Sequence, residues 1–133
     1  MITVLFACVH NAGRSQIAAA LFTEAADPTK ARAISAGTHP ADRVHPEVVE
    51  VMRSRGIDLS MATPRKLTPE LAATAQWLIT MGCGDERPVV PGTRRDDWPL
   101  PDPKGQGPDA VTAIATDIEA RVMALLESQS WQR

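Results

Sequence analysis

The chain begins, after its first methionine, with ITVLFACVHNAGRSQIAAALF (residues 2–22). Residues 2–7 form an unbroken apolar and β-branched run, which is typical of a strand buried on both faces of a parallel sheet. From Ser15 onward the residues are strong helix formers, and Pro28 ends this pattern. Three apolar residues of the helix fall on one face: Ile17, Leu21 and Phe22. The stretch therefore predicts a buried strand, a short loop and a helix with one apolar face.

The same alternation of strand and helix continues along the chain. Strands are expected at residues 32–35 and 76–81, with at most a short one at 94–98, and helices at 45–56, from Thr68 onward and at 108–127. Residues 82–107 are rich in proline and glycine, which predicts a long ordered loop of functional importance. The order predicts an α/β fold, a four-stranded mostly parallel sheet with helices on both faces. The length of 133 residues suits a single domain, 1–133.

Composition excludes several classes of protein. The formal net charge of -2 argues against a nucleic-acid binder, which needs a basic face. No apolar run is long enough to span a membrane, and the opening residues lack a basic region and a cleavage site of a signal peptide. We therefore expect a cytoplasmic protein, monomeric, with no membrane or nucleic-acid partner and with its two cysteines reduced.

The segment from Cys8 to Ser15 runs from the predicted buried strand into a helix N-terminus. Backbone N–H groups of such a loop point inward, and the helix dipole adds positive charge where a tetrahedral oxyanion would bind. The expected oxyanion-binding residues are consecutive: Val9, His10, Asn11, Ala12, Gly13, Arg14 and Ser15. Arg14 offers a bidentate guanidinium, and the same positive field favours the thiolate of Cys8. The pattern predicts a cysteine nucleophile inside an anion site, although an inert buried thiol or a non-enzymatic oxyanion sensor would fit the same residues.

Several motifs together resemble a known family. VLFACVHNAGRSQIAAALF, ISAGTHP, MGCGDERPVVPG and RRDDWPLPDP are similar to segments of the arsenate reductases related to low-molecular-weight tyrosine phosphatases. The resemblance implies that fold, with Cys8 attacking arsenate, Arg14 holding its oxygens and Asp102 protonating the departing oxygen. Asp85, Asp96 and Asp97 are competing carboxylates nearby.

The second half of the reaction needs another thiol, which attacks the Cys8 sulfur and releases arsenite. Cys83 is the only other cysteine, and the third cysteine of the thioredoxin-coupled relatives is missing, because Glu86, Arg87 and Pro88 stand there. Either Cys83 resolves the intermediate and thioredoxin reduces the disulfide, or a small thiol such as mycothiol forms an adduct that a glutaredoxin-like partner reduces. Cys83 as a passive apolar residue is a third possibility. No metal and no tightly bound cofactor are expected, only this external thiol reductant.

A low-molecular-weight phosphatase is the alternative enzyme. It would form a cysteinyl-phosphate at Cys8, and water activated by Asp102 would hydrolyse it. The chain contains no tyrosine, and the residues after the Asp-Pro pair are Lys104, Gly105 and Gln106, which offer no aromatic wall for a phosphotyrosine ring. The sequence therefore favours the reductase over a phosphotyrosine phosphatase.

Overall fold

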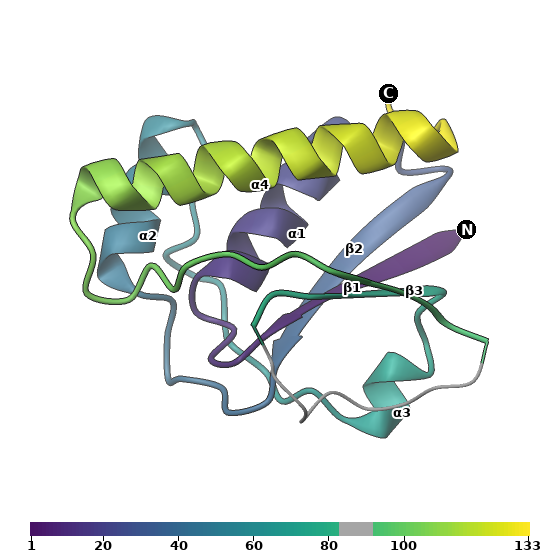
Figure 1. Cartoon of the computed structure of the whole chain (residues 1–133), viewed down its shortest axis with the longest axis horizontal. Coiled ribbons are helices and arrows are strands. Elements are labelled where there is room, and N and C mark those ends of the chain that lie inside the picture. The colour runs from purple at the N-terminus through teal and green to yellow at the C-terminus, as the bar shows by residue number, and fades with distance from the viewer. Residues whose placement is uncertain (83–91) are drawn as a thin grey trace.

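The structure is a computed structural model, and it describes residues 1–82 and 92–133. Its elements follow the order β1 (Ile2–Cys8), α1 (Arg14–Ala25), β2 (Ala31–Gly37), α2 (Pro46–Ser54), α3 (Pro69–Ala72), β3 (Trp77–Thr80), β4 (Arg94–Asp97) and α4 (Pro108–Gln129). The strands lie in the order β2-β1-β3-β4, and each neighbouring pair is parallel. This confirms the predicted four-stranded α/β sheet (Figure 1).

Helices cover both faces of the sheet, but unequally. Figure 1 shows α1, α2 and α4 on one side and the short α3 on the other. The side chains of β1 alternate accordingly: Val4, Phe6 and Cys8 belong to the large core under α1 and α4, whereas Leu5 and Ala7 face the smaller cluster that includes Ala72 of α3. Cys8 therefore ends the central strand on the better covered face of the sheet.

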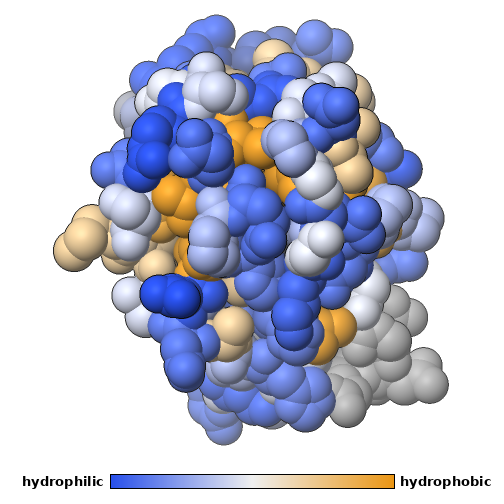
Figure 2. Space-filling view, turned by 90° about the vertical axis from the view of Figure 1, so that its left-hand side faces the viewer, coloured by the Kyte–Doolittle hydropathy of each residue, from blue (hydrophilic) through white to orange (hydrophobic). Residues whose placement is uncertain are grey.

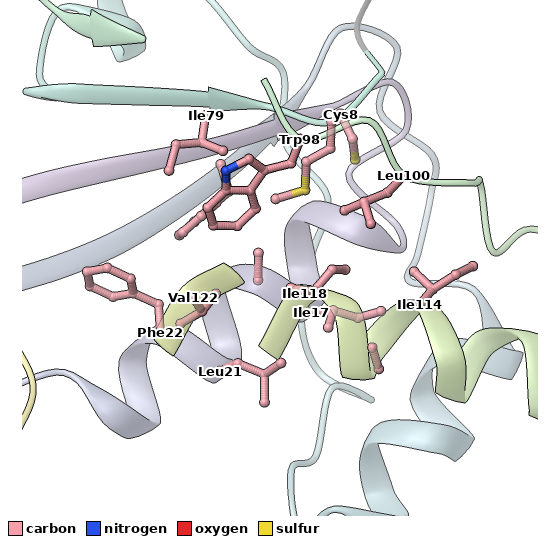
Figure 3. Close-up of a cluster of buried hydrophobic side chains, with 14 of the residues drawn as sticks. Cys8, Ile17, Leu21, Phe22, Ile79, Trp98, Leu100, Ile114, Ile118 and Val122 are labelled. Carbon is pink, nitrogen blue, oxygen red and sulfur yellow. The ribbon is translucent and has the colours of Figure 1, made fainter. Parts of the chain in front are cut away.

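The large core is built on the apolar stripes that the sequence predicts. α4 contributes apolar residues spaced three and four apart, all of them buried: Val111, Ile114, Ile118, Val122 and Leu125. Phe6 of β1 lies 5.8 Å from Phe22 and 5.6 Å from Trp98, measured between ring centroids. Figure 3 shows this cluster with Cys8 and Leu100 at its edge. Burying each large apolar side chain contributes roughly 1.5–3 kcal/mol, so the end of β1 rests on a rigid base.

The element boundaries differ slightly from the expected ones. The second strand is longer than the expected 32–35, because β2 pairs with β1 over its whole length from Ala31 to Gly37. β4 is a true strand although all four of its side chains are exposed. Backbone pairing with β3 forms it, and exposed charges suit the edge of a sheet. Within residues 1–82 and 92–133, no helix combines the length and apolar character that a membrane crossing requires.

Candidate active site

The site lies at the carboxyl end of β1, the central strand next to β3. Cys8 is the last residue of β1, and only 2 % of its surface is exposed. Residues 9–13 form a loop, here called the anion loop, and α1 begins at Arg14. The sequence folds this way locally because the apolar strand is anchored in the core and Gly13 is the N-cap of the helix that follows. The thiol thus stands at the junction of a buried strand and a helix N-terminus.

The anion loop turns its carbonyl groups outward. The carbonyl oxygens of Val9, His10 and Ala12 accept hydrogen bonds from the backbone N–H groups of His39, Ala41 and His45, at 2.7, 3.0 and 2.9 Å. Among the described residues, nothing accepts a hydrogen bond from the N–H groups of residues 10–13. Unpaired N–H groups in a mostly buried loop at a helix N-terminus form a cradle for an anion. Anion binding by this loop stays a prediction.

Asn11 braces the loop from within. It is fully buried and adopts a left-handed backbone with φ of 48°, which asparagine tolerates better than most residues. Its Oδ1 accepts hydrogen bonds from the backbone N–H of Arg65 at 3.0 Å and from Nε2 of Gln16 at 3.2 Å. Its Nδ2 donates to Oγ of Ser15 at 2.7 Å. These contacts fix the curvature of the anion loop.

Ser15 contacts the thiol directly. Its Oγ lies 2.8 Å from Sγ of Cys8. Because this oxygen already accepts a hydrogen bond from Asn11, its own hydrogen is free to be donated to the sulfur. Ser15 therefore connects the sulfur of Cys8 to the side chain of Asn11.

Arg14 is the buried cation of the site. Only 7 % of its surface is exposed, and its Nη1 donates a hydrogen bond of 3.0 Å to the carbonyl oxygen of Leu100. Its Nη2 lies 4.0 Å from Oδ2 of Asp102, so the carboxylate and the guanidinium form a loose ion pair. Leu100 and Asp102 come from residues 98–103, here called the strap, which crosses the site from β4 towards α4.

The strap carries Asp102 to the rim of the site. Prolines occupy every second position after Trp98, and the last of them, Pro103, is buried against Gly13. A Cβ added at Gly13 would lie 2.6 Å from Cγ of Pro103, so the absence of a side chain permits this contact. The side chain of Asp102 is 44 % exposed, and its Oδ1 accepts a hydrogen bond from the N–H of Lys104. One carboxylate oxygen therefore remains close to Arg14 and accessible to a ligand.

The competing carboxylates occupy other positions. Asp96 on β4 accepts hydrogen bonds from Nε1 of Trp98 and from the N–H of Asp97. Asp97 accepts one from Oγ1 of Thr80 at 2.7 Å. Asp85 and Cys83, the proposed resolving thiol, lie outside the described residues. Of the described candidates, Asp102 is the one whose carboxylate is paired with Arg14.

All three histidines of the chain lie around the anion loop. The ring of His10 contacts the carbonyl oxygen of His39 through Nδ1, at 3.1 Å, and lies 6.2 Å from the ring of His45. Partial burial lowers the pKa of His45 below its ordinary value, although Glu47 and Asp102 oppose the effect. No group of three histidine, cysteine or acidic side chains suited to a metal ion occurs in the part of the chain that the structure describes.

Four contacts of the site are not evident from the sequence. They come from Gln16, Arg65, Gly82 and Leu100. Arg65 and Leu100 act through backbone atoms and lie 54 and 86 residues from their partners, so no local motif marks them. Gln16 belongs to the segment NAGRSQ (residues 11–16), and Gly82 belongs to MGCGD (residues 81–85). These two family motifs are the only features of the sequence that point to Gln16 and Gly82.

The resemblance to a known family extends beyond these motifs to nearly the whole chain. The protein family described as "Low molecular weight phosphotyrosine protein phosphatase" matches residues 3–133, from β1 to the end of the chain. The chain belongs to this family. The family match confirms the resemblance read from the sequence, and it covers both the anion loop and the strap.

Among family relatives, several are named for arsenate. A Halobacterium salinarum protein, provisionally named an arsenate reductase, is 40 % identical over 92 % of this chain and 89 % of its own length. The Synechocystis glutaredoxin arsenate reductase is 31 % identical over 92 % of this chain and 95 % of its own. Among solved structures, the Corynebacterium glutamicum thioredoxin-dependent arsenate reductase has 41 % identity and a TM-score of 0.82. That alignment covers 96 % of this chain but only 61 % of the Corynebacterium chain.

Proposed function

We propose that this protein is a thiol-dependent arsenate reductase in which Cys8 is the nucleophile. The observation that carries the proposal is the position of Sγ of Cys8, 2.8 Å from Oγ of Ser15 at the base of a loop with unpaired N–H groups. Arsenate would bind to the N–H groups of residues 9–15 and to the guanidinium of Arg14. The similarity to proteins named arsenate reductases, at 40 and 41 % identity, supports this substrate.

The first step forms a bond between sulfur and arsenic. The Cys8 thiolate attacks arsenic, and one arsenic–oxygen bond breaks. The departing oxygen leaves as water, because Asp102 supplies a proton that hydroxide would otherwise lack. Asp102 is suited to this role because it is partly exposed and lies at the rim beside Arg14. The intermediate is an arsenylated Cys8 that still contains arsenic(V).

The second step transfers two electrons. A second thiolate attacks Sγ of Cys8, a disulfide forms, and the electron pair of the sulfur–arsenic bond stays on arsenic, which leaves as arsenite. We propose that the attacking thiol is either Cys83 or a small thiol, with thioredoxin or a glutaredoxin-like protein as the final reductant. Gly82, the residue that precedes Cys83, lies beside Arg14. We expect the enzyme to be monomeric and cytoplasmic. In the cytoplasm these thiols are kept in their reduced form.

The rim of the site favours a small oxyanion over phosphotyrosine. Among the described residues, the groups around the anion loop and the strap include His39, His45 and Lys104, and no ring of Phe or Trp is exposed there. Figure 2 shows the end of the molecule at which the strands terminate, and it is mostly hydrophilic with small separate hydrophobic patches. Such a surface offers little to a large aromatic substrate.

The decisive experiment is arsenate turnover with thioredoxin and with small thiols. The wild type should release arsenite, and Cys8→Ser should be inactive. If Cys83 resolves the intermediate, Cys83→Ser should be inactive with thioredoxin, whereas full activity with a small thiol would support the adduct route. Hydrolysis of p-nitrophenyl phosphate without thiol-dependent arsenite release would favour the phosphatase. An active Cys8→Ser would disprove the mechanism.

A further inference from the structure

The guanidinium of Arg14 fits into a slot that exists only because residue 82 is a glycine. A Cβ built on Gly82 would lie 2.6 Å from Nη1 of Arg14 and 3.4 Å from its Cζ. Real Cβ atoms essentially never approach another atom as closely as 2.6 Å, so any side chain here would displace the guanidinium. Gly82 also adopts φ of 90°, a conformation that glycine enters freely.

The other side of the slot is the strap. The carbonyl oxygen of Leu100 accepts the hydrogen bond from the same nitrogen, Nη1, at 3.0 Å. Leu100 is itself anchored in the large core, with 8 % of its surface exposed (Figure 3). Nη1 is therefore fixed between the backbone of Gly82 and a carbonyl group held by the core. Nη2, which faces Asp102, remains available to an oxyanion.

We propose that Gly82 is a positioning residue for Arg14. Its missing side chain and the Leu100 carbonyl oxygen together fix the guanidinium with Nη1 turned away from the ligand. This inference rests on the proposed function, because it assumes that Arg14 binds the oxyanion. It assigns a role to one glycine of the MGCGD motif that is independent of Cys83 and of any reductant.

The test compares two glycines with the same backbone conformation. Gly56 has φ of 81°, close to that of Gly82, but a Cβ built there meets nothing within 4 Å. Gly56→Ala therefore reproduces the backbone strain of Gly82→Ala without the clash. The measurement is binding of inorganic phosphate by calorimetry, with the thermal unfolding midpoint of each variant recorded in parallel. Phosphate is a tetrahedral anion of the same class, and its binding requires no reduction.

Gly82→Ala is expected to weaken phosphate binding about 10- to 100-fold, since a hydrogen bond between charged groups, which a displaced guanidinium would lose, contributes about that much to affinity. Gly56→Ala should remain within about twofold of the wild type. The effect should also depend on Arg14. In an Arg14→Lys background the Nη1 atom is absent, so adding Gly82→Ala should cost no more than about threefold.

Two results would overturn the proposal. One is phosphate binding by Gly82→Ala within twofold of the wild type, and the other is an equal loss from Gly82→Ala in the Arg14→Lys background. If Gly82→Ala does not fold, Arg14→Lys should restore folding by removing the clash, and failure to restore it would also refute the slot. A wild type that binds phosphate but does not reduce arsenate would count against the proposed function and leave this inference standing.

Discussion

Gly13→Ala is the substitution that best tests the contact between the anion loop and Pro103 of the strap. A Cβ at this position would lie 2.6 Å from Cγ and 3.3 Å from Cδ of Pro103. Carbon atoms in contact normally lie about 3.5–4.0 Å apart, so Pro103 would have to move by about 1 Å. The substitution adds no polar group to the anion loop and displaces the Pro103 end of the strap, next to Asp102, whereas Leu100 stays anchored in the large core.

The expected effect falls on the chemical step. A positioned general acid contributes about 100- to 10,000-fold, and a 1 Å misplacement costs about 100-fold. We therefore expect kcat for arsenate to fall about 100-fold, which corresponds to roughly 2.7 kcal/mol of transition-state stabilisation. KM for arsenate should change by no more than about threefold, because the loop N–H groups and Arg14 remain and bind substrate and transition state alike.

The assay is steady-state arsenate reduction, with Gly107→Ala as the matched control. Gly107 is likewise a helix N-cap with negative φ, but a Cβ there meets nothing within 4 Å. Asp102→Asn, alone and combined with Gly13→Ala, completes the cycle. The reasoning would be wrong if Gly13→Ala kept kcat within twofold. It would also be wrong if Gly13→Ala cost a further 100-fold in the Asp102→Asn background, since the loss should already be present there.

Three further substitutions test the surroundings of the site. Trp98→Ala should lower the free energy of unfolding by about 3–5 kcal/mol and the unfolding midpoint by more than about 10 °C, because Trp98 is buried against Phe6. Calorimetry should show that Trp98→Phe retains most of this stability. Asn11→Ala should cost about 3 kcal/mol in urea unfolding and abolish phosphate binding. Alanine is less stable in the left-handed conformation, and Ser15 and Arg65 lose their hydrogen bonds to the Asn11 side chain. Unchanged phosphate binding would contradict the bracing role. His45→Gln should make stability less dependent on pH. Burial lowers the pKa of His45 in the folded protein, so the unfolded chain binds a proton more readily at low pH. The wild type should therefore lose more stability than the variant between pH 7 and pH 5. Equal losses in urea titrations at the two pH values would exclude this contribution.

The sequence predicts the elements of this fold well where side-chain pattern and backbone pairing agree. The apolar run at residues 2–7 is found as strand β1, and the helix expected at 108–127 is found as α4. β4 is harder to recognise, because its letters RRDD carry no strand pattern and its existence depends on hydrogen bonds to β3. Chain topology alone brings those two segments together, and no local propensity encodes it.

The residues of the site also divide into those that a local pattern predicts and those that depend on tertiary contacts. Cys8, Arg14 and Ser15 share one contiguous motif, so their proximity follows from a strand leading into a helix. The choice of Asp102 over Asp96 and Asp97 needed the family resemblance and stays a prediction. In the structure, Asp102 is the one of these three carboxylates that lies beside Arg14. The bracing of the loop through a backbone N–H 54 residues away depends on tertiary contacts, which a single sequence does not contain.

The alternating prolines of the strap also affect the entropy of the site. Pro99, Pro101 and Pro103 have restricted φ angles even in the unfolded chain, and each such residue can stabilise a compatible folded segment by about 0.4–1 kcal/mol. None of the three has an N–H group, so between Trp98 and Lys104 only Leu100 and Asp102 carry backbone donors. A stiff segment with few donors holds a carboxylate in place at little conformational cost, without offering many hydrogen bonds that would compete for the incoming anion.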